Sequence, residues 1–392
     1  MNQFDKIKVM TVFGTRPEAI KMAPLVKELQ KNQDKIDSIV TVTAQHREML
    51  DQVLETFKIN PDYDLNIMKD RQTLTDVTIN ALKGLDNVIK SVKPDLILVH
   101  GDTTTTFAAS LAAFYNQVAV GHVEAGLRTW DKYSPFPEEM NRQLTGTMAD
   151  LHFAPTEKAA DNLLEEGKNR DAIFITGNTA IDALGSTVTS EYEHPLLTEL
   201  GEDKLILLTA HRRENLGEPM RNIFRAIKCI VDEYDNVQIV YPVHLNPSVR
   251  EAANDILGNN ARVHLIEPLG VEDFHNFMDR AYLILTDSGG VQEEAPSLGT
   301  PVLVLRDTTE RPEGIEAGTL KLAGTDQKTI YSLIQQLLED PELYQSMAQS
   351  SNPYGDGKAS NRIVEAIKYY FKRVEEKPND FKIQKEVEPS LS

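Results

Sequence analysis

The chain has 392 residues, so two domains of ordinary size are expected. Its formal net charge is -19, with 60 acidic against 41 basic residues, which disfavours nucleic acid or an anionic membrane as a broad-surface partner. A single cysteine excludes a disulfide framework and a cysteine-rich zinc site. The N-terminus has no signal-peptide pattern, and no stretch approaches the roughly 18 apolar residues of a membrane span, so a cytoplasmic location is expected.

Apolar runs typical of buried strands alternate with helical patterns along most of the chain, as at residues 19–29 and 74–92. In the first half the predicted strands are residues 7–13, 38–43, 95–100, 118–123, 151–154 and 173–176. A second series follows at residues 205–209, 237–241, 263–266, 282–285 and 301–305. Continuous apolar strands separated by helices indicate parallel sheets covered on both faces. The predicted fold class is therefore α/β, with two doubly wound, Rossmann-like domains.

Polar and glycine-containing stretches divide these elements into domains. Residues 186–203 are polar and contain a proline and a glycine, which predicts a boundary between an N-terminal domain, 1–185, and a C-terminal domain, 186–357. Residues 358–376 carry a helical pattern that is expected to return to the first domain. Residues 377–392 are charged and poor in large apolar side chains, which predicts a disordered tail. Because ligands bind beyond the carboxyl ends of parallel strands, we expect a substrate cleft between the domains.

The sequence GTRPE at residues 14–18 follows the first predicted strand. Pro17 suits the first position of a helix, and Arg16 beside it can meet a phosphate with two parallel hydrogen bonds. Lys21 lies about one turn further along the same helix. Solvent-exposed charge at a helix start is the alternative interpretation. The segment is neither a GxGxxG nor a Walker sequence, so dinucleotide and NTPase functions lose support.

Three carboxylates follow the strands of the first domain. Asp102 comes after the predicted strand 95–100, Glu124 ends the strand 118–123, and Glu138 opens the next helix. We expect them to gather at one edge of one sheet, where they could exchange protons with a substrate. Asp102 could instead cap a helix, and Glu138 could simply serve the helix dipole, whereas a carboxylate ending a buried strand needs a partner or a function.

The second domain repeats this arrangement with basic residues. His211 stands beside two arginines after the strand 205–209, where it could donate to a phosphate or carry a proton, although a loop histidine satisfied by the backbone is the alternative. His244 ends the following strand. Arg311 lies in the sequence RPE, the same context as Arg16, which again places an arginine beside a helix start. No HExxH sequence or clear histidine–carboxylate ligand cluster is present, so no metal site is predicted.

The stretch LILTDSGGVQEE at residues 283–294 combines a strand, a tight turn over residues 287–290 and a helix predicted over residues 291–298. This geometry directs free backbone N–H groups at one point, and glycine lets an anion approach closely, so phosphate is the expected ligand. Glu293 and Glu294 follow in the first turn, and one of them is expected to reach a neutral hydroxyl such as that of a ribose. An ordinary strand-to-helix turn is the alternative.

Taken together, these sequences resemble a known family. The segments GTRPE (14–18), HGD (100–102), VEAGLR (123–128), PEEMNR (137–142), AHRREN (210–215), TDSGGVQEE (286–294) and RDTTERPE (306–313) are similar to those of the non-hydrolysing bacterial UDP-N-acetylglucosamine 2-epimerases. The resemblance covers nearly the whole chain, from about residue 6 to about residue 370. It implies a GT-B-type fold, a homodimer, and reversible conversion of UDP-GlcNAc to UDP-ManNAc without nicotinamide or metal.

The resemblance also assigns roles to residues. It implies an acid/base set of Asp102, Glu124 and Glu138, with His211 as a further catalytic candidate. It implies that UDP or substrate is bound by Arg16, Lys21, His211, Phe274, Ser288, Gly289, Gly290, Glu294 and Arg311. A second UDP-GlcNAc, acting as an allosteric activator, is expected at Gln45, Arg71, Glu138, Arg212 and His244. Relatives often carry glutamine where Glu48 stands here, which puts one contact of that second site in doubt.

Three other functions are compatible with parts of this pattern. A GT-B glycosyltransferase would share the fold and the glutamate at the ribose, but transfer to an acceptor does not explain three clustered carboxylates. A hydrolysing epimerase would release free ManNAc instead of UDP-ManNAc. A non-catalytic sensor of UDP-sugars would not need the acid/base residues. The product formed from UDP-GlcNAc alone distinguishes these possibilities.

Overall fold

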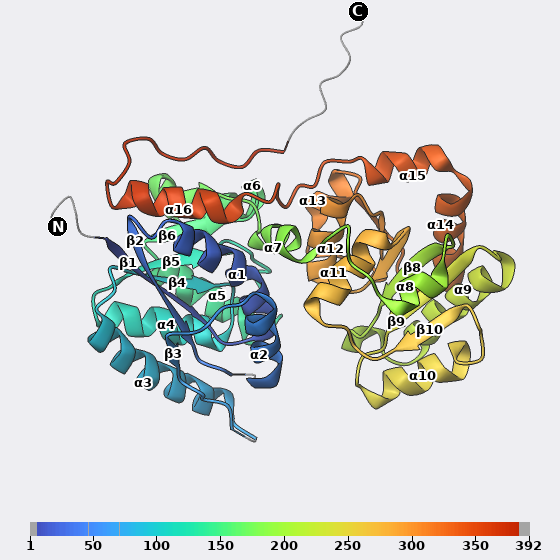
Figure 1. The fold of residues 1–392 in the computed structure, drawn as a ribbon, viewed down its shortest axis with the longest axis horizontal. Helices are drawn as coiled ribbons and strands as arrows, with labels where there is room; N and C mark the ends of the chain where they lie inside the picture. The colour runs from blue at the N-terminus through green and yellow to red at the C-terminus, as the bar shows by residue number, and fades with distance from the viewer. Residues whose placement is uncertain (1–5, 46, 70, 384–392) are drawn as a thin grey trace, which may run out of the picture. The chain divides into compact units, whose positions relative to one another are not determined.

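A computed structural model describes residues 6–45, 47–69 and 71–383 of the chain. The chain divides into two compact units. Unit 1 contains the described residues up to Ser186 and the later segment Tyr354–Lys382, whereas unit 2 contains Thr187–Pro353. In Figure 1 unit 1 runs from blue to green and includes the red helix α16, and unit 2 runs from green to orange-red.

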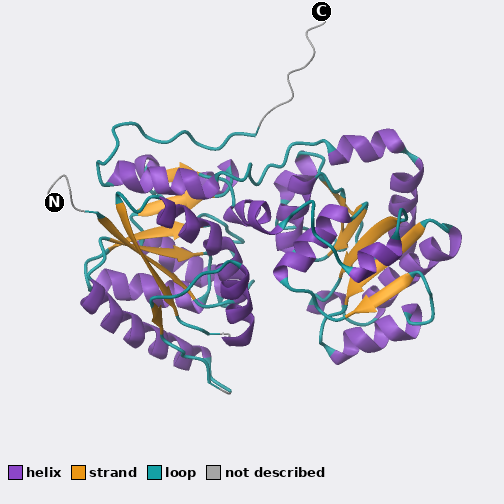
Figure 2. Cartoon of the chain, viewed as in Figure 1, coloured by secondary structure: helices purple, strands orange, loops and turns teal. Residues whose placement is uncertain are grey.

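Unit 1 is built on a seven-stranded parallel sheet with the order β3-β2-β1-β4-β5-β6-β7. Figure 2 shows strands in orange and helices in purple. Its strands are β1 Ile7–Phe13, β2 Ile36–Val42, β3 Tyr63–Asp64, β4 Leu96–His100, β5 Ala119–Val123, β6 Leu151–Ala154 and β7 Ile173–Ile175. Its helices are α1 Arg16–Lys31, α2 Arg47–Thr56, α3 Leu74–Val92, α4 Thr104–Tyr115, α5 Glu138–Met148, α6 Glu157–Glu165, α7 Thr179–Thr187 and α16 Ala359–Tyr370.

Unit 2 is built on a six-stranded parallel sheet with the order β10-β9-β8-β11-β12-β13. Its strands are β8 Lys204–Thr209, β9 Val237–Pro242, β10 Val263–Ile266, β11 Leu283–Thr286, β12 Val302–Val304 and β13 Leu320–Leu322. Its helices are α8 Pro195–Leu200, α9 Glu218–Glu233, α10 Pro247–Leu257, α11 Val271–Arg280, α12 Gly289–Glu294, α13 Pro312–Glu316, α14 Gln327–Glu339 and α15 Pro341–Ala348.

The central strands are buried on both faces, as their continuous apolar sequences require. All five residues of β4 and all four of β11 are buried. On one face of the unit 1 sheet, Met10 and Val12 pack with residues of α3 and α4, while α1 packs against α16 and α2. In unit 2 the apolar face of α9, including Ile223 and Ile227, packs on β8 and β9. These rigid layers fix the positions of the loops that follow the strands.

The loop after β1 is held by a buried carboxylate. Thr15 caps α1, and Glu18 accepts hydrogen bonds from the backbone N–H groups of Gly14 and Thr15 at 3.0 and 2.8 Å. Its other oxygen accepts from the Thr103 hydroxyl at 2.7 Å, in the loop after β4. Glu18 therefore ties two neighbouring loops at the carboxyl edge of the sheet, between which other side chains can be positioned.

The C-terminal segment differs from the disordered tail predicted for residues 377–392. Phe381 is only 8% exposed, and its N–H donates to Ile175 O at 2.7 Å. The Ile175 N–H donates to Asp380 Oδ1 at 2.9 Å, and Asp380 also pairs with Arg170 at 2.7 Å. The segment thus covers the edge strand β7, because one apolar side chain and a backbone pairing offset its polar composition. Residues 384–392 lie outside the described part of the chain.

Candidate active site

Three carboxylates lie close together at the carboxyl edge of the unit 1 sheet. Asp102 follows β4, Glu124 follows β5, and Glu138 is the first residue of α5. Burial raises the pKa of the Asp102 carboxyl, the Arg142 guanidinium opposes this shift, and the charges of Glu124 and Glu138 add to it. Arg142 Nη2 lies 2.9 Å from Asp102 Oδ2. The three side chains therefore share one electrostatic environment.

Glu124 has the most constrained surroundings of the three. Its backbone is in the left-handed region, with φ of 62°, a conformation that costs free energy for a residue other than glycine. Its carboxylate forms an ion pair with Lys21 and accepts from Asn178 Nδ2 at 3.0 Å. A Cβ at Gly101 would lie 3.6 Å from Glu124 Oε1, so glycine leaves room beside the carboxylate. Strained backbone with fixed partners is typical of residues that position a reactive group.

A buried histidine adjoins Glu124. The His100 side chain is 4% exposed, and its Nε2 lies 3.7 Å from Glu124 Oε2, beyond hydrogen-bond distance. Burial lowers the pKa of His100 to about 4, so the imidazole is neutral near pH 7. Among the described residues, Nε2 has no hydrogen-bond partner. His100 thus presents an unsatisfied nitrogen to the carboxylate cluster.

Helix α1 carries two basic residues that were predicted to bind the substrate, and one of them contacts this cluster. Lys21, predicted to bind UDP, is the ion-pair partner of Glu124. Arg16 begins α1 and is partly buried, and this burial lowers the pKa of its guanidinium. Lys21, which was predicted to bind an anionic ligand, therefore also neutralises the charge of the Glu124 carboxylate.

In unit 2 the loop after β8 is organised by Asp287, which is fully buried. Its Oδ2 accepts from the N–H groups of His211 and Arg212 at 2.9 and 2.8 Å and from Asn215 Nδ2 at 3.0 Å. His211 stacks on His244 with ring centroids 5.2 Å apart. Burial lowers the pKa of His211, while Asp287 opposes the shift. The structure thus brings His211 and Arg212 together with His244 from the next strand.

The glycine turn after β11 differs in detail from its prediction. Gly289 and Gly290 are the first residues of α12, which ends at Glu294 and continues as a 3₁₀ turn, Ala295–Leu298. Neither glycine has a positive φ. A Cβ at Gly289 would lie 3.4 Å from Arg311 Nη2, so the glycine leaves open the space beside that guanidinium. Ser288, Gly289 and Gly290 are partly exposed, between buried Asp287 and buried Val291.

The two glutamates of α12 have different environments. Glu293 is buried and forms an ion pair with Arg311. Glu294 is partly exposed, and its Oε2 lies 3.8 Å from His275 Nε2. Glu294 is therefore the one of the pair that can meet a ribose hydroxyl. Phe274, one residue before His275 on α11, is also partly exposed.

The remaining predicted residues lie apart in the sequence, on loops of unit 1. Gln45 follows β2, and its Oε1 accepts from the Thr105 hydroxyl at 3.3 Å. Arg71 is exposed, with φ of 56°. Arg142, Asn178 and His100 were not predicted as site residues. Their roles arise from contacts with residues far along the chain, and the only local signal was that Arg142 follows Glu138 by one helical turn.

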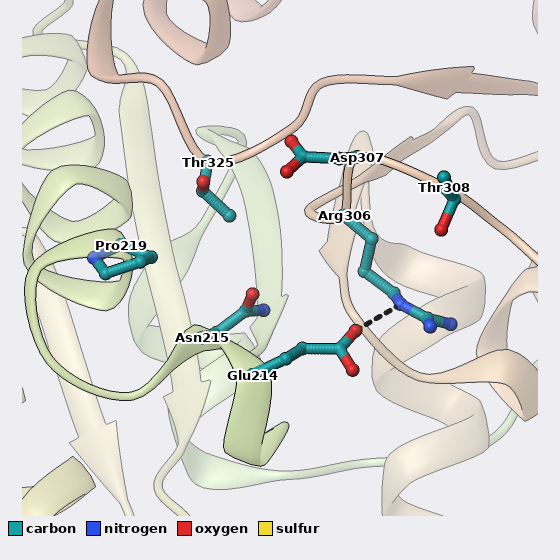
Figure 3. Close-up of a pocket in the computed structure, with 7 residues that line it drawn as sticks. All are labelled: Glu214, Asn215, Pro219, Arg306, Asp307, Thr308 and Thr325. Carbon is teal, nitrogen blue, oxygen red and sulfur yellow. Dashed lines mark hydrogen bonds and ion pairs between the residues drawn. The ribbon is translucent and has the colours of Figure 1, made fainter. Parts of the chain in front are cut away.

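A separate pocket of about 270 Å³ lies in unit 2. Arg306 points toward Glu214 on its wall, and their ion pair measures 2.7 Å (Figure 3). It is lined by Glu214, Asn215, Pro219, Arg306, Asp307, Thr308 and Thr325, none of which was a predicted site residue. Within the described residues, no group of three histidine, cysteine or acidic side chains could hold a metal ion. In the same part of the chain, no helix is long and apolar enough to cross a membrane.

Two parallel α/β units, one with clustered carboxylates and one with a glycine turn beside an arginine, define the class of the protein as an enzyme of the GT-B type, as the sequence predicted. A family model described as UDP-N-acetylglucosamine 2-epimerase matches residues 27–368. The chain belongs to this family, and it is an epimerase, an enzyme of the isomerase class.

Relatives support this assignment over almost the full length. The UDP-N-acetylglucosamine 2-epimerase of Bacillus subtilis is 70% identical over 96% of this chain and 99% of its own. The structure of the Listeria monocytogenes epimerase superposes with a TM-score of 0.92 at 60% identity, over 96% of this chain and 100% of that chain. The structure of the Neisseria meningitidis enzyme bound to UDP-GlcNAc gives a TM-score of 0.84 at 53% identity. That comparison covers 92% of this chain and 99% of the other chain.

Proposed function

We propose that the protein interconverts UDP-GlcNAc and UDP-ManNAc by eliminating UDP and adding it back. No carbonyl in the sugar ring acidifies the C2 proton, so its direct removal would be very slow. When the bond from C1 to UDP breaks, positive charge develops at C1 and the C2 proton becomes acidic. The C2–H electrons then form the C1=C2 bond of 2-acetamidoglucal, and UDP leaves with the C1–O electrons. Re-addition of UDP at C1, with a proton delivered to the other face of C2, gives the epimer.

The shared environment of Asp102, Glu124 and Glu138 is the main support for this mechanism. Proton removal from one face of C2 and delivery to the other requires two groups that alternate between acid and base. Lys21 and Asn178 both contact the Glu124 carboxylate and keep it in one position. Glu124 is therefore suited to be one of the two proton-transfer groups. His211, on unit 2, is a further candidate for proton transfer or for stabilising the departing diphosphate.

The departing UDP requires stabilisation of its developing negative charge. Arg311 and the partly exposed backbone at Ser288, Gly289 and Gly290 supply donors for the diphosphate, since Arg311 lies directly against Gly289. Glu294 meets the ribose, and Phe274 contacts the uracil. Arg16 and Lys21 add positive charge on the sugar side. The Neisseria meningitidis relative, solved with UDP-GlcNAc bound, supports a UDP-sugar as the substrate.

Incubation with UDP-GlcNAc alone in deuterated water tests the reaction. Proton NMR should show UDP-ManNAc with deuterium at C2, because the abstracted proton exchanges with solvent. Asp102→Asn, Glu124→Gln and Glu138→Gln should each lower kcat by roughly 10²-fold or more while leaving UDP binding largely intact. A product that keeps its original C2 hydrogen, or normal turnover in all three variants, would refute the mechanism.

The same incubation separates the proposed reaction from two of the rival functions. A hydrolysing epimerase would give free ManNAc and UDP, and a glycosyltransferase would leave UDP-GlcNAc unchanged without an acceptor. An oxygen-18 label in the bond to C1 should exchange between bridging and non-bridging positions of UDP if that bond breaks. Retention of the label in the bridging position would argue against elimination.

We also infer that a second UDP-GlcNAc activates the enzyme through Gln45, Arg71, Glu138, Arg212 and His244. Two of these residues are linked to His211, one of the proposed catalytic groups, either directly or through a shared partner. His244 stacks on His211, and Arg212 donates from its backbone to the same Asp287 oxygen that His211 contacts. Binding at these positions would therefore bias the orientation of His211.

We infer that the enzyme is a homodimer that works in the cytoplasm and supplies ManNAc for cell-surface polysaccharide. The adjacent side chains Phe114 and Tyr115, at the end of α4, are 61% and 65% exposed, and such rings are enriched at protein interfaces. A mass equal to one chain by light scattering at micromolar concentration would contradict the dimer. Loss of ManNAc from the surface polymers of a deletion strain would support the supply role, and unchanged polymers would contradict it.

A further inference from the structure

The start of α5 contacts the Asp102 region at two points. Glu138, Asn141 and Arg142 are spaced by three and four residues, so they share one face of the helix. Asn141 Nδ2 donates to the backbone oxygen of Asp102 at 2.9 Å. Arg142 Nη2 lies 2.9 Å from the Asp102 carboxylate. The helix that supplies Glu138 therefore also fixes the main chain and the side chain of Asp102.

Arg142 stands between two carboxylates, Asp102 and Glu139, and its shorter contact is with Asp102. Glu139 is fully buried, and its oxygens already accept from the N–H groups of Thr129 and Trp130 at 3.0 and 3.2 Å and from Gln143 Nε2 at 2.8 Å. Its Oε2 lies 3.6 Å from Arg142 Nε, which has no hydrogen-bond partner among the described residues. The short contact of the guanidinium is therefore with Asp102.

The other charges near Asp102 act in opposite directions. Glu124 and Glu138 are like charges that disfavour an ionised Asp102, and burial acts in the same direction. Lys21 favours the ionised form, but less than Arg142 does, and Lys21 is itself paired with Glu124. Removing Arg142 would leave Asp102 among two carboxylates with no cation of its own.

We propose that Arg142 is a positioning residue that keeps Asp102 ionised and in one orientation, so that Asp102 enters the reaction as the proton acceptor. This rests on the proposed function, in which Asp102 belongs to the acid/base set. Asp102 cannot accept the C2 proton if it is already protonated at neutral pH. Arg142 touches neither the sugar nor UDP in this scheme and acts through Asp102 alone.

The pH profile of kcat/KM in Arg142→Met tests this role. The acidic limb should move to higher pH by roughly one to three units, the shift expected when an opposite charge within about 4–6 Å is lost. Activity at pH 7 should fall at least about tenfold and recover substantially near pH 9, where Asp102 is again ionised. UDP affinity should stay within about twofold of the parent value. Arg142→Lys, which keeps the charge, should give a smaller shift of the limb.

Arg128→Met is the matched control. Arg128 is another buried arginine of unit 1, paired with Glu166 at 2.6 Å. Its loss should lower the melting temperature without moving the acidic limb. A loss of activity in Arg142→Met by the same factor at every pH would overturn the proposal, as would a limb that moves as far in Arg142→Lys as in Arg142→Met. Asp102→Asn separates the two levels of inference, because normal turnover in that variant would remove Asp102 from the acid/base set of the proposed function, whatever Arg142→Met does.

Discussion

Three buried histidines occupy adjacent strands of unit 1. His122 on β5 pairs in register with His152 on β6, and His100 ends β4. Burial lowers the pKa of His100 to about 4, that of His122 to about 3 and that of His152 to about 4. Each is neutral in the folded protein at pH 6, whereas an unfolded chain would bind protons at all three near pH 6.5.

Stability should therefore fall on acidification. The folded pKa of each histidine lies below its unfolded value, so the stabilisation is present above about pH 6.5 and is lost as the pH falls toward 4. Between pH 7 and pH 5 the loss should be on the order of 2 kcal/mol for each histidine. Urea titrations at both pH values measure it. His152→Gln should reduce the difference between the two pH values. The same difference in His152→Gln and in the parent protein would show that His152 is not responsible.

At the scale of elements, strands were easier to predict than turns. The strand predicted at residues 7–13 is β1 with the same bounds, because six of its seven positions are buried and leave a strong apolar signal. The predicted turn over residues 287–290 instead contains the first residues of α12. Glycine there was expected to let an anion approach closely, and the structure places the Arg311 guanidinium, 22 residues away in the chain, beside Gly289.

Gly289→Ala tests this assignment of glycine. The added methyl group would stand 3.4 Å from Arg311 Nη2, in the space that the proposed diphosphate needs. UDP affinity by calorimetry should fall about tenfold or more, the equivalent of losing about 1.4 kcal/mol. The melting temperature should hold, since the glycine has no positive φ. Gly185→Ala, with no atom within 4 Å of its added methyl, is the control. Equal UDP affinity in Gly289→Ala and the parent would place the diphosphate elsewhere.

The candidate site was predictable where its residues directly follow strands. Asp102 and Glu124 were found this way because parallel strands present their carboxyl ends at one edge. Arg142, Asn178 and His100 were not, because nothing local reveals that their partner is Asp102 or Glu124. The short strands β3 and β13 were also missed, since Asp64 in β3 and Lys321 in β13 interrupt the apolar run by which the comparably short β7 and β12 were predicted.

At the scale of the whole molecule, the residues assigned to activation come from both units. Gln45, Arg71 and Glu138 belong to unit 1, whereas Arg212 and His244 belong to unit 2. A ligand can shift an enzyme between forms only by its differential affinity for them. The substrate would therefore regulate its own conversion if these residues bind it more tightly in the active form.

UDP-ManNAc free of UDP-GlcNAc should accordingly be converted slowly, with a lag that a trace of UDP-GlcNAc removes. Gln45→Ala and Arg212→Ala should abolish this activation and keep most of the UDP affinity. Glu48→Gln shows whether the glutamate at that position weakens the effect. Coupled assays of the reverse reaction measure the lag. Full initial velocity with purified UDP-ManNAc would rule out the second site.

The C-terminal segment that covers β7 also bears on how the protein behaves during synthesis and purification. Until residues 380 and 381 have left the ribosome, β7 is an open sheet edge whose backbone groups can pair with any extended chain. A chain shortened before Asp380 would keep this edge exposed permanently. Its defect would then be precipitation during expression, even though every proposed catalytic residue is retained. For the same reason, a purification tag should be added after Lys382 and should not replace the residues before it.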